Sequence, residues 1–198
     1  MATRAAIVAA AAERFAEVGY HGATLSEILA RSGVTKGAMY FHFPHKEAVA
    51  EAVIAATDAA WTQLLVELDA REWDPLRSVV VLTERVVDTV HRDPVARGGV
   101  RLLNDAAVTV EHGAEHYRFA EEAVVTRLRE AAEAGVLRPA VDPAVLARQV
   151  ATLMAGHNLI CDRSDTLDEL PARVAAMWDV LLPLIASDDW LAEYRVDT

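Results

Sequence analysis

The chain has 198 residues, of which 53% are hydrophobic, and a net charge of −11. This composition excludes a disordered chain, and the single cysteine, Cys161, excludes an internal disulfide. The longest unbroken apolar run covers residues 5–12, whereas a membrane-spanning helix needs about 20 apolar residues. No small-residue cleavage site follows that run, so we expect a cytoplasmic protein that neither spans a membrane nor carries a secretory signal.

The charge is unevenly distributed along the chain. Residues 1–50 contain five basic and four acidic side chains, so this segment carries +1 and the remainder carries −12. Both lysines of the chain, Lys36 and Lys46, lie in the first segment. The contrast predicts two regions with different partners, of which only the first suits a polyanion.

Apolar residues recur at helical spacing throughout, and no stretch alternates long enough to predict a sheet. We therefore predict an all-α chain of about nine helices. The first has an apolar stripe that begins at Ile7 and ends near Val18, before Gly19. A capping box at Thr24 and Glu27 predicts a short helix over residues 25–31.

The next elements complete a first domain over residues 1–48. Gly33 suits a tight turn, and Thr35 is a good N-cap for a second short helix that ends near Phe41. Pro44 stops that helix and opens a longer one, which extends to about Ala70 and joins the first domain to a second over residues 49–198.

The second domain is marked by repeated helix-start signals. Asp-Pro pairs at 74–75, 93–94 and 142–143 each predict an N-cap followed by proline in the first turn. Gly135 ends a helix that begins near Glu111, and residues 167–186 predict a late helix with Pro183 near its end. From Ser187 onward we expect a short polar tail.

Two short helices joined by a glycine-containing turn of about three residues are typical of a helix-turn-helix, which places its second helix in the DNA major groove. The polar and small residues of the second helix, and the lysine that starts the next, suit phosphates and base edges. The predicted DNA contacts are Thr35, Lys36, Gly37, Tyr40, His42 and Lys46. The alternative is a helix pair that serves only packing, with Tyr40, Phe41 and Phe43 as core aromatics.

Residues 3–55, and above all the run 33–47, resemble the DNA-binding domain of TetR-family transcriptional regulators. Segments 93–94, 97–102, 163–167 and 173–183 are similar to the γ-butyrolactone receptor subgroup of actinomycetes. The resemblance implies an all-helical homodimeric repressor that binds a palindromic operator on double-stranded DNA. It also implies that the C-terminal helices hold a pocket for a small-molecule inducer and form the dimer interface.

One departure from this subgroup concerns the pocket. The resemblance implies a pocket tryptophan in the segment 116–120, where this chain has none and Phe119 is the nearest substitute. Gln63, His157 and Asn158 are the candidate polar groups of the pocket. A receptor with this lining would be a pseudo-receptor whose inducer is larger or more polar than a simple butyrolactone.

Other residue pairs offer different chemistry. His112 and His116 could bind a metal from one helix face, but no third ligand is fixed, so a solvated helix start is the simpler interpretation. His157 and Cys161 could form the dyad of a small helical enzyme, although nothing nearby predicts an oxyanion hole. We therefore predict a non-enzymatic protein without metal or cofactor.

Overall fold

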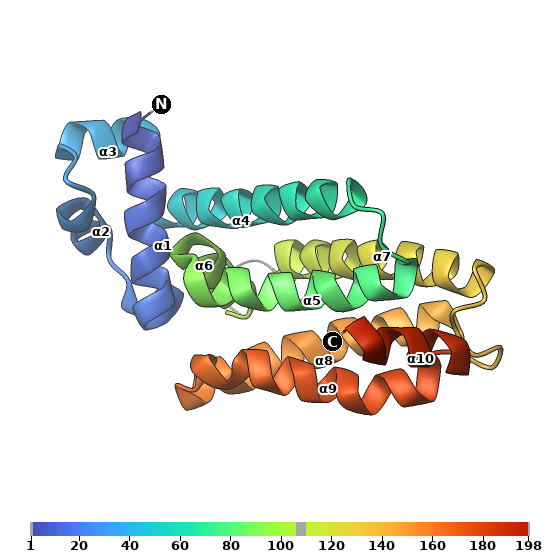
Figure 1. Ribbon diagram of the computed structural model, residues 1–198. Coiled ribbons are helices and arrows are strands. Elements are labelled where there is room, and N and C mark those ends of the chain that lie inside the picture. Colours follow the sequence, from blue (N-terminus) through green and yellow to red (C-terminus); the bar gives the residue numbers. More distant parts are fainter. Residues whose placement is uncertain (1, 106–109, 198) are drawn as a thin grey trace. The chain divides into compact units, whose positions relative to one another are not determined.

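The computed structural model describes residues 2–105 and 110–197, and this part of the chain is almost entirely helical (Figure 1). The helices are α1 (Ala2–Gly22), α2 (Leu25–Ser32), α3 (Lys36–His42), α4 (Lys46–Asp69), α5 (Pro75–Arg92), α6 (Pro94–Leu103), α7 (Val110–Glu133), α8 (Pro143–Ser164), the short 3-10 helix η1 (Leu167–Glu169), α9 (Leu170–Ile185) and α10 (Asp188–Asp197). The all-α prediction is confirmed. The described residues form ten α-helices where about nine were predicted.

The chain divides into two compact units. The first contains residues 1–63 and 89–116, and the second contains residues 64–88 and 117–198. The first unit thus includes α6 and the beginning of α4 in addition to α1, α2 and α3.

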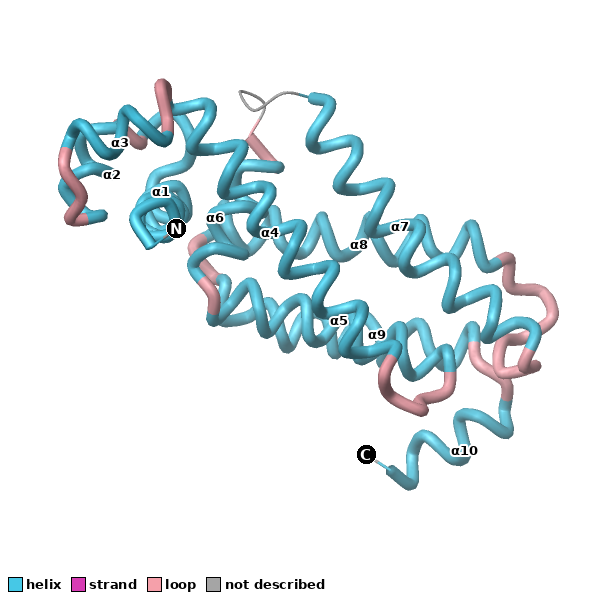
Figure 2. Tube along the Cα trace, turned by 90° about the horizontal axis from the view of Figure 1, so that it is seen from above, coloured by secondary structure: helices cyan, strands magenta, loops and turns pink. Residues whose placement is uncertain are grey.

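The core of the first unit forms around α1, which Figures 1 and 2 show beside α2, α3 and α6. Ile7, Ala11 and Phe15 of the predicted stripe are completely buried. Helical geometry is interrupted at Gly19, whose φ is 71°, so the predicted end of the first helical segment is confirmed. Helix α6 approaches α1 so closely that a Cβ atom at Gly98 would overlap the carbonyl of Ala12.

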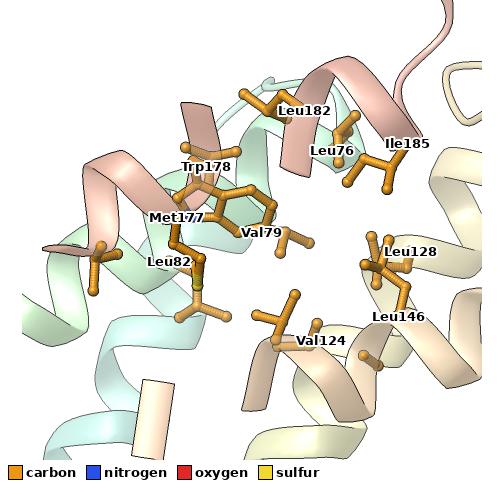
Figure 3. Close-up of a cluster of buried hydrophobic side chains, with 14 of the residues drawn as sticks. Leu76, Val79, Leu82, Val124, Leu128, Leu146, Met177, Trp178, Leu182 and Ile185 are labelled. Atoms are coloured by element: carbon orange, nitrogen blue, oxygen red, sulfur yellow. The ribbon is translucent and has the colours of Figure 1, made fainter. Parts of the chain in front are cut away.

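The second unit has a larger apolar core, drawn in Figure 3. Leu76 and Val79 of α5 pack there with Leu128 of α7. Trp178 of α9 is only 3% exposed, and its Nε1–H donates a hydrogen bond to Thr83 Oγ1 at 2.7 Å. Trp178 is therefore a core residue of this unit.

The three Asp-Pro helix starts are confirmed. Asp93 and Asp142 are the N-caps of α6 and α8, and Asp74 precedes α5. In each case the aspartate Oδ1 accepts a hydrogen bond of 2.8 or 2.9 Å from a backbone N–H of the first turn. These contacts satisfy amide groups that a helix start would otherwise leave unpaired.

The predicted polar tail is wrong, because residues 188–197 form α10. Trp190 anchors this helix: it is 6% exposed, and its Nε1–H donates to Asp74 Oδ1 at 2.8 Å. Its ring also stacks on Tyr194 with the centroids 4.6 Å apart. A single buried indole therefore orders a segment whose charged residues suggested a solvated end.

Helix α4 is long and apolar enough, by length and composition alone, to cross a membrane. Polar residues interrupt the helix, so no unbroken apolar run marks it in the sequence. Val49 and Val53, on one face of the helix, are completely buried in the core of the first unit. The apolar character of α4 is therefore used in packing.

Candidate nucleic-acid interface

The interface candidate starts with α2 and the turn that follows it. Thr24 Oγ1 accepts the Glu27 backbone N–H at 3.3 Å, and Glu27 Oε2 accepts the Thr24 backbone N–H at 3.0 Å. This is the predicted capping box, now confirmed. Gly33 ends α2 with a φ of 68°, a left-handed conformation that glycine adopts without strain. Residues 33–35 form the turn, which has the predicted length of about three residues, and α2 extends one residue beyond its predicted end.

Helix α3 is fixed at its start by a cap and along one face by apolar side chains. Thr35 Oγ1 accepts the Ala38 backbone N–H at 3.2 Å. Met39 and Phe43, four residues apart, are 1% and 3% exposed, so they turn this face toward the core of the first unit. The packing alternative is therefore correct for Phe43.

The opposite face of α3 is exposed. It carries two pairs of residues four apart, Lys36 with Tyr40 and Gly37 with Phe41, and Tyr40 is 47% and Phe41 84% exposed. The Lys36 ammonium lies 6.0 Å from the centroid of the Tyr40 ring. A Cβ atom added at Gly37 would meet no other atom within 4 Å. The face thus combines a cation, a phenol, an open backbone position and an apolar ring.

The sequence prediction did not include Phe41 among the DNA contacts, and the packing alternative, which made it a core aromatic, is wrong for this residue because it is 84% exposed. The spacing of Met39 and Phe43 indicates this exposure. The two apolar residues are four apart and share one face of the helix, so the residue midway between them, Phe41, lies on the opposite face. His42 is half-buried, and its ring lies edge-on to Phe41 with the centroids 5.2 Å apart. It is thus at the margin of the exposed face.

The environment of Lys46 differs from that of Lys36. The Lys46 ammonium donates hydrogen bonds to the carbonyl oxygens of Tyr20 at 2.8 Å and Ala23 at 3.0 Å. It also lies 4.2 Å from the centroid of the Tyr20 ring. Lys46 is therefore directed toward the end of α1, although the sequence assigns it to a DNA phosphate.

Ion pairs join α1 to α2 behind the turn. Arg14 contacts Glu17 at 3.1 Å and Glu27 at 2.8 Å, and Arg31 contacts Glu17 at 2.7 Å. Hydrogen bonds from Arg31 and Arg14 hold the pKa of the Glu17 carboxyl below its usual value. Hydrogen bonds from Thr24 and Arg14 likewise lower the pKa of Glu27. Both carboxylates are thus stabilised in their charged form, which supports this arrangement of α1 and α2 at neutral pH.

The candidate ligand-binding residues fall in both units. Gln63 is exposed on α4 and belongs to the first unit. Phe119, which is 38% exposed on α7, belongs to the second unit, as do the half-buried His157 and Asn158 on α8. Partial burial of a histidine and an asparagine on one helix is compatible with a polar position in an otherwise apolar pocket.

The alternative chemistries receive little support. Cys161 is completely buried, so its thiol is not accessible to a substrate as the enzyme hypothesis requires. Among the residues that the structure describes, no group of three or more His, Cys, Asp or Glu side chains could hold a metal. His116 Nδ1 lies 2.9 Å from Asp58 Oδ1, whereas the His112 side chain lies outside the described residues.

The fold and the exposed recognition face define a helix-turn-helix protein, and comparisons with known proteins identify its family. Residues 7–53 match the model of the bacterial regulatory proteins of the tetR family, and residues 74–186 match the tetracyclin repressor-like C-terminal domain. The chain belongs to the TetR family of transcriptional regulators. Membership of this family supports a role in the regulation of transcription.

Similar proteins are known in sequence and in structure. The A-factor receptor protein of Streptomyces griseus is 34% identical over 195 residues, which cover 96% of this chain and 68% of that protein. A crystal structure of a γ-butyrolactone receptor, described as ArpA-like, has a TM-score of 0.84 at 32% identity and covers 97% of this chain and 92% of that one. CprB from Streptomyces coelicolor, solved in complex with its biological operator sequence, has a TM-score of 0.77 at 32% identity with the same coverage.

Proposed function

We propose that the protein is a ligand-responsive repressor that binds a palindromic DNA operator through α3 and is released by a small signalling molecule. The observation that carries the proposal is the exposed face of α3, with Lys36, Tyr40 and Phe41 around the open position at Gly37. Operator binding by CprB, a relative at 32% identity, supports the same role here.

Each residue of this face has a distinct task. Lys36 neutralises a phosphate, and Tyr40 donates a hydrogen bond from its hydroxyl to another phosphate or a base edge. Thr35 and His42 lie at the two ends of α3 and serve as further polar contacts. Gly37 lets the helix backbone approach the groove. Phe41 provides an apolar contact of the kind that recognises the methyl group of thymine.

The proposed homodimer is formed through α8 and α9. These helices are joined by a short connection and pack side by side in an antiparallel pair (Figure 1). Apolar side chains on the pair are strongly exposed: Ile160 is 51%, Val180 65% and Leu184 65% exposed. Burying them against a second copy removes apolar surface from water. A two-fold dimer then requires half-sites about 34 Å apart, or a multiple of that distance.

The proposed inducer is a γ-butyrolactone or a related, more polar metabolite. Similarity to the A-factor receptor and to γ-butyrolactone receptor structures supports the class. The absent pocket tryptophan and the half-buried His157 and Asn158 favour a ligand with additional polar groups. Phe119 of the second unit would supply an apolar wall. A coupling of about 1 to 3 kcal/mol between inducer and operator lowers DNA affinity roughly 5- to 150-fold.

DNA binding is tested with a duplex that the protein itself selects from a random-sequence pool. The affinity is then measured over a range of salt concentrations for wild type, Lys36→Ala and Arg71→Ala. Arg71 is a matched control because it is an exposed cation of the second unit. We expect Lys36→Ala to reduce the salt slope by about one and Arg71→Ala to leave it unchanged. Equal slopes for all three proteins would contradict the role of Lys36.

The inducer class is tested by titrating a simple alkyl γ-butyrolactone against the selected complex. We expect weak release, because a simple alkyl ligand gives the His157 imidazole no partner in the proposed pocket, and an unpaired polar group costs about 1 to 3 kcal/mol, or roughly 5- to 150-fold in affinity. Nanomolar release that persists in a His157→Ala variant would contradict the more polar inducer. Light scattering of the free protein at micromolar concentration tests the dimer, and a monomer would contradict it.

A further inference from the structure

Lys46 is the first residue of α4, and residues 43–45 alone connect it to α3. An ammonium group has three N–H donors. Two of them are used in hydrogen bonds to the carbonyl oxygens of Tyr20 and Ala23, at 2.8 and 3.0 Å. The cation also faces the Tyr20 ring at 4.2 Å, within the range of a cation–π contact. Two of the three donors, and one side of the charge, are thus engaged within the protein.

The partners of Lys46 lie where a cation is favoured. Tyr20 follows the break at Gly19, and Ala23 lies in the connection between α1 and α2. Carbonyl groups at the end of a helix lack intrahelical partners and carry partial negative charge. A lysine at the start of α4 is unfavourable for that helix, because a helix start carries partial positive charge. The partial negative charge of the carbonyl groups at the end of α1 compensates it.

Tyr20 is also held from α6. Its backbone N–H donates to Asp105 Oδ2 at 3.2 Å, just beyond the end of α6, and Arg101 of α6 donates to the Ala16 carbonyl at 2.6 Å. The end of α1 is therefore fixed by α6 on one side and by Lys46 on the other. All of these contacts lie within the first unit.

We propose that Lys46 is a positioning residue: it fixes the start of α4, and through residues 43–45 the orientation of α3, and does not neutralise an operator phosphate. A seven-residue helix such as α3 does not hold its own conformation or direction without tertiary contacts. Its connection to α4 is short, so a displacement of the start of α4 displaces α3. The inference rests on the proposed DNA binding.

The test compares Lys46→Met with Lys36→Met on the duplex that wild type selects from a random-sequence pool. Methionine keeps an unbranched side chain but removes the charge and the donors. We expect Lys46→Met to lower affinity about tenfold at every salt concentration with the wild-type salt slope, since tenfold corresponds to about 1.4 kcal/mol, which is within reach of a lost charged hydrogen bond. Lys36→Met should instead reduce the slope by about one.

A reduced slope for Lys46→Met, equal to that of Lys36→Met, would overturn the proposal by showing a phosphate contact. Unchanged affinity together with a lower melting temperature would also overturn it, by showing a purely stabilising role. Tyr20→Leu is the independent variant if Lys46→Met does not fold: it removes the ring beneath the ammonium, and we expect a smaller loss of affinity with an unchanged slope. Unchanged affinity in Tyr20→Leu would overturn the proposal as well. If wild type enriches no duplex, the proposed DNA binding fails first, and the inference with it.

Discussion

The helices on either side of the turn in the first unit have eight and seven residues, whereas α8 and α9 of the second unit have 22 and 16. The short helices are held by caps at Thr24 and Thr35 and by ion pairs near the surface. The long helices share a core of large apolar side chains, such as Leu128 and Trp178 (Figure 3). The comparison teaches that the short helices combine buried apolar anchors, Ile28 and Met39, with caps and surface ion pairs, whereas the long helices of the second unit share a larger buried apolar volume.

The largest effect is expected in the core of the second unit. Trp178→Ala should reduce the free energy of unfolding by about 3 to 5 kcal/mol, because it leaves a cavity and removes the indole N–H that donates to the Thr83 hydroxyl. Val66→Ala is the control: Val66 is 58% exposed in the same unit, so we expect a change within about 0.5 kcal/mol. Urea denaturation measures both variants. Similar values for the two would contradict a stabilising core around Trp178.

A smaller effect is expected at a cap of the first unit. Thr24→Ala should cost about 1 kcal/mol, because the Thr24 hydroxyl no longer accepts the Glu27 backbone N–H or donates to Glu27 Oε2. Thr62→Ala, on the exposed side of α4, should change stability by less than about 0.5 kcal/mol. Hydrogen exchange of α2 amides reports the local change. Unaltered protection in Thr24→Ala would show that the cap is not needed.

The smallest expected effect is the response to acid. It has opposite signs in the two units, because the shifted carboxyl pKa values are lowered in the first and raised in the second. The pKa values of Glu17 and Glu27 are lowered in the folded state, so their stabilising contribution is present above the ordinary value of 4.5 and is lost as pH falls below it. Partial burial raises the pKa of Glu84 in the second unit, so its contribution has the opposite sign and favours the folded state at lower pH.

Hydrogen exchange at pH 7 and at about pH 4 tests this difference after correction for intrinsic exchange rates. We expect amides of α1 and α2 to lose protection in acid, and a Glu17→Gln, Glu27→Gln double variant to lose less on acidification. Glu84→Gln should have no such effect on α1 and α2. If the acid response of α1 and α2 persists unchanged in the double variant, titratable groups other than Glu17 and Glu27 cause it.

Much of this architecture could be predicted because it depends on local signals. The capping box at Thr24, the turn at Gly33 and the three Asp-Pro starts are contacts between residues close in sequence. Helix α10 could not be predicted in this way, since Trp190 is bound by Asp74, 116 residues away. A long-range contact of one side chain leaves no periodic pattern in a charged segment.

In the candidate site, too, some features follow from local sequence signals and others depend on long-range contacts. The position of the recognition helix followed from sequence, and the exposure of Phe41 could have been deduced from the spacing of Met39 and Phe43. The environment of Lys46 could not, because residue type and position suggest a phosphate contact equally well. Only the placement of the Tyr20 and Ala23 carbonyls distinguishes the two roles.

The central claim is that the exposed face of α3 approaches DNA closely, and Gly37→Ala tests it most directly. A Cβ atom at Gly37 meets nothing within 4 Å, and alanine favours a helix over glycine by about 1 kcal/mol. We therefore predict that Gly37→Ala is at least as stable as wild type in urea denaturation but binds the selected duplex about tenfold more weakly, a loss of about 1.4 kcal/mol. Equal or higher affinity in the stable variant would contradict close approach of this face to DNA.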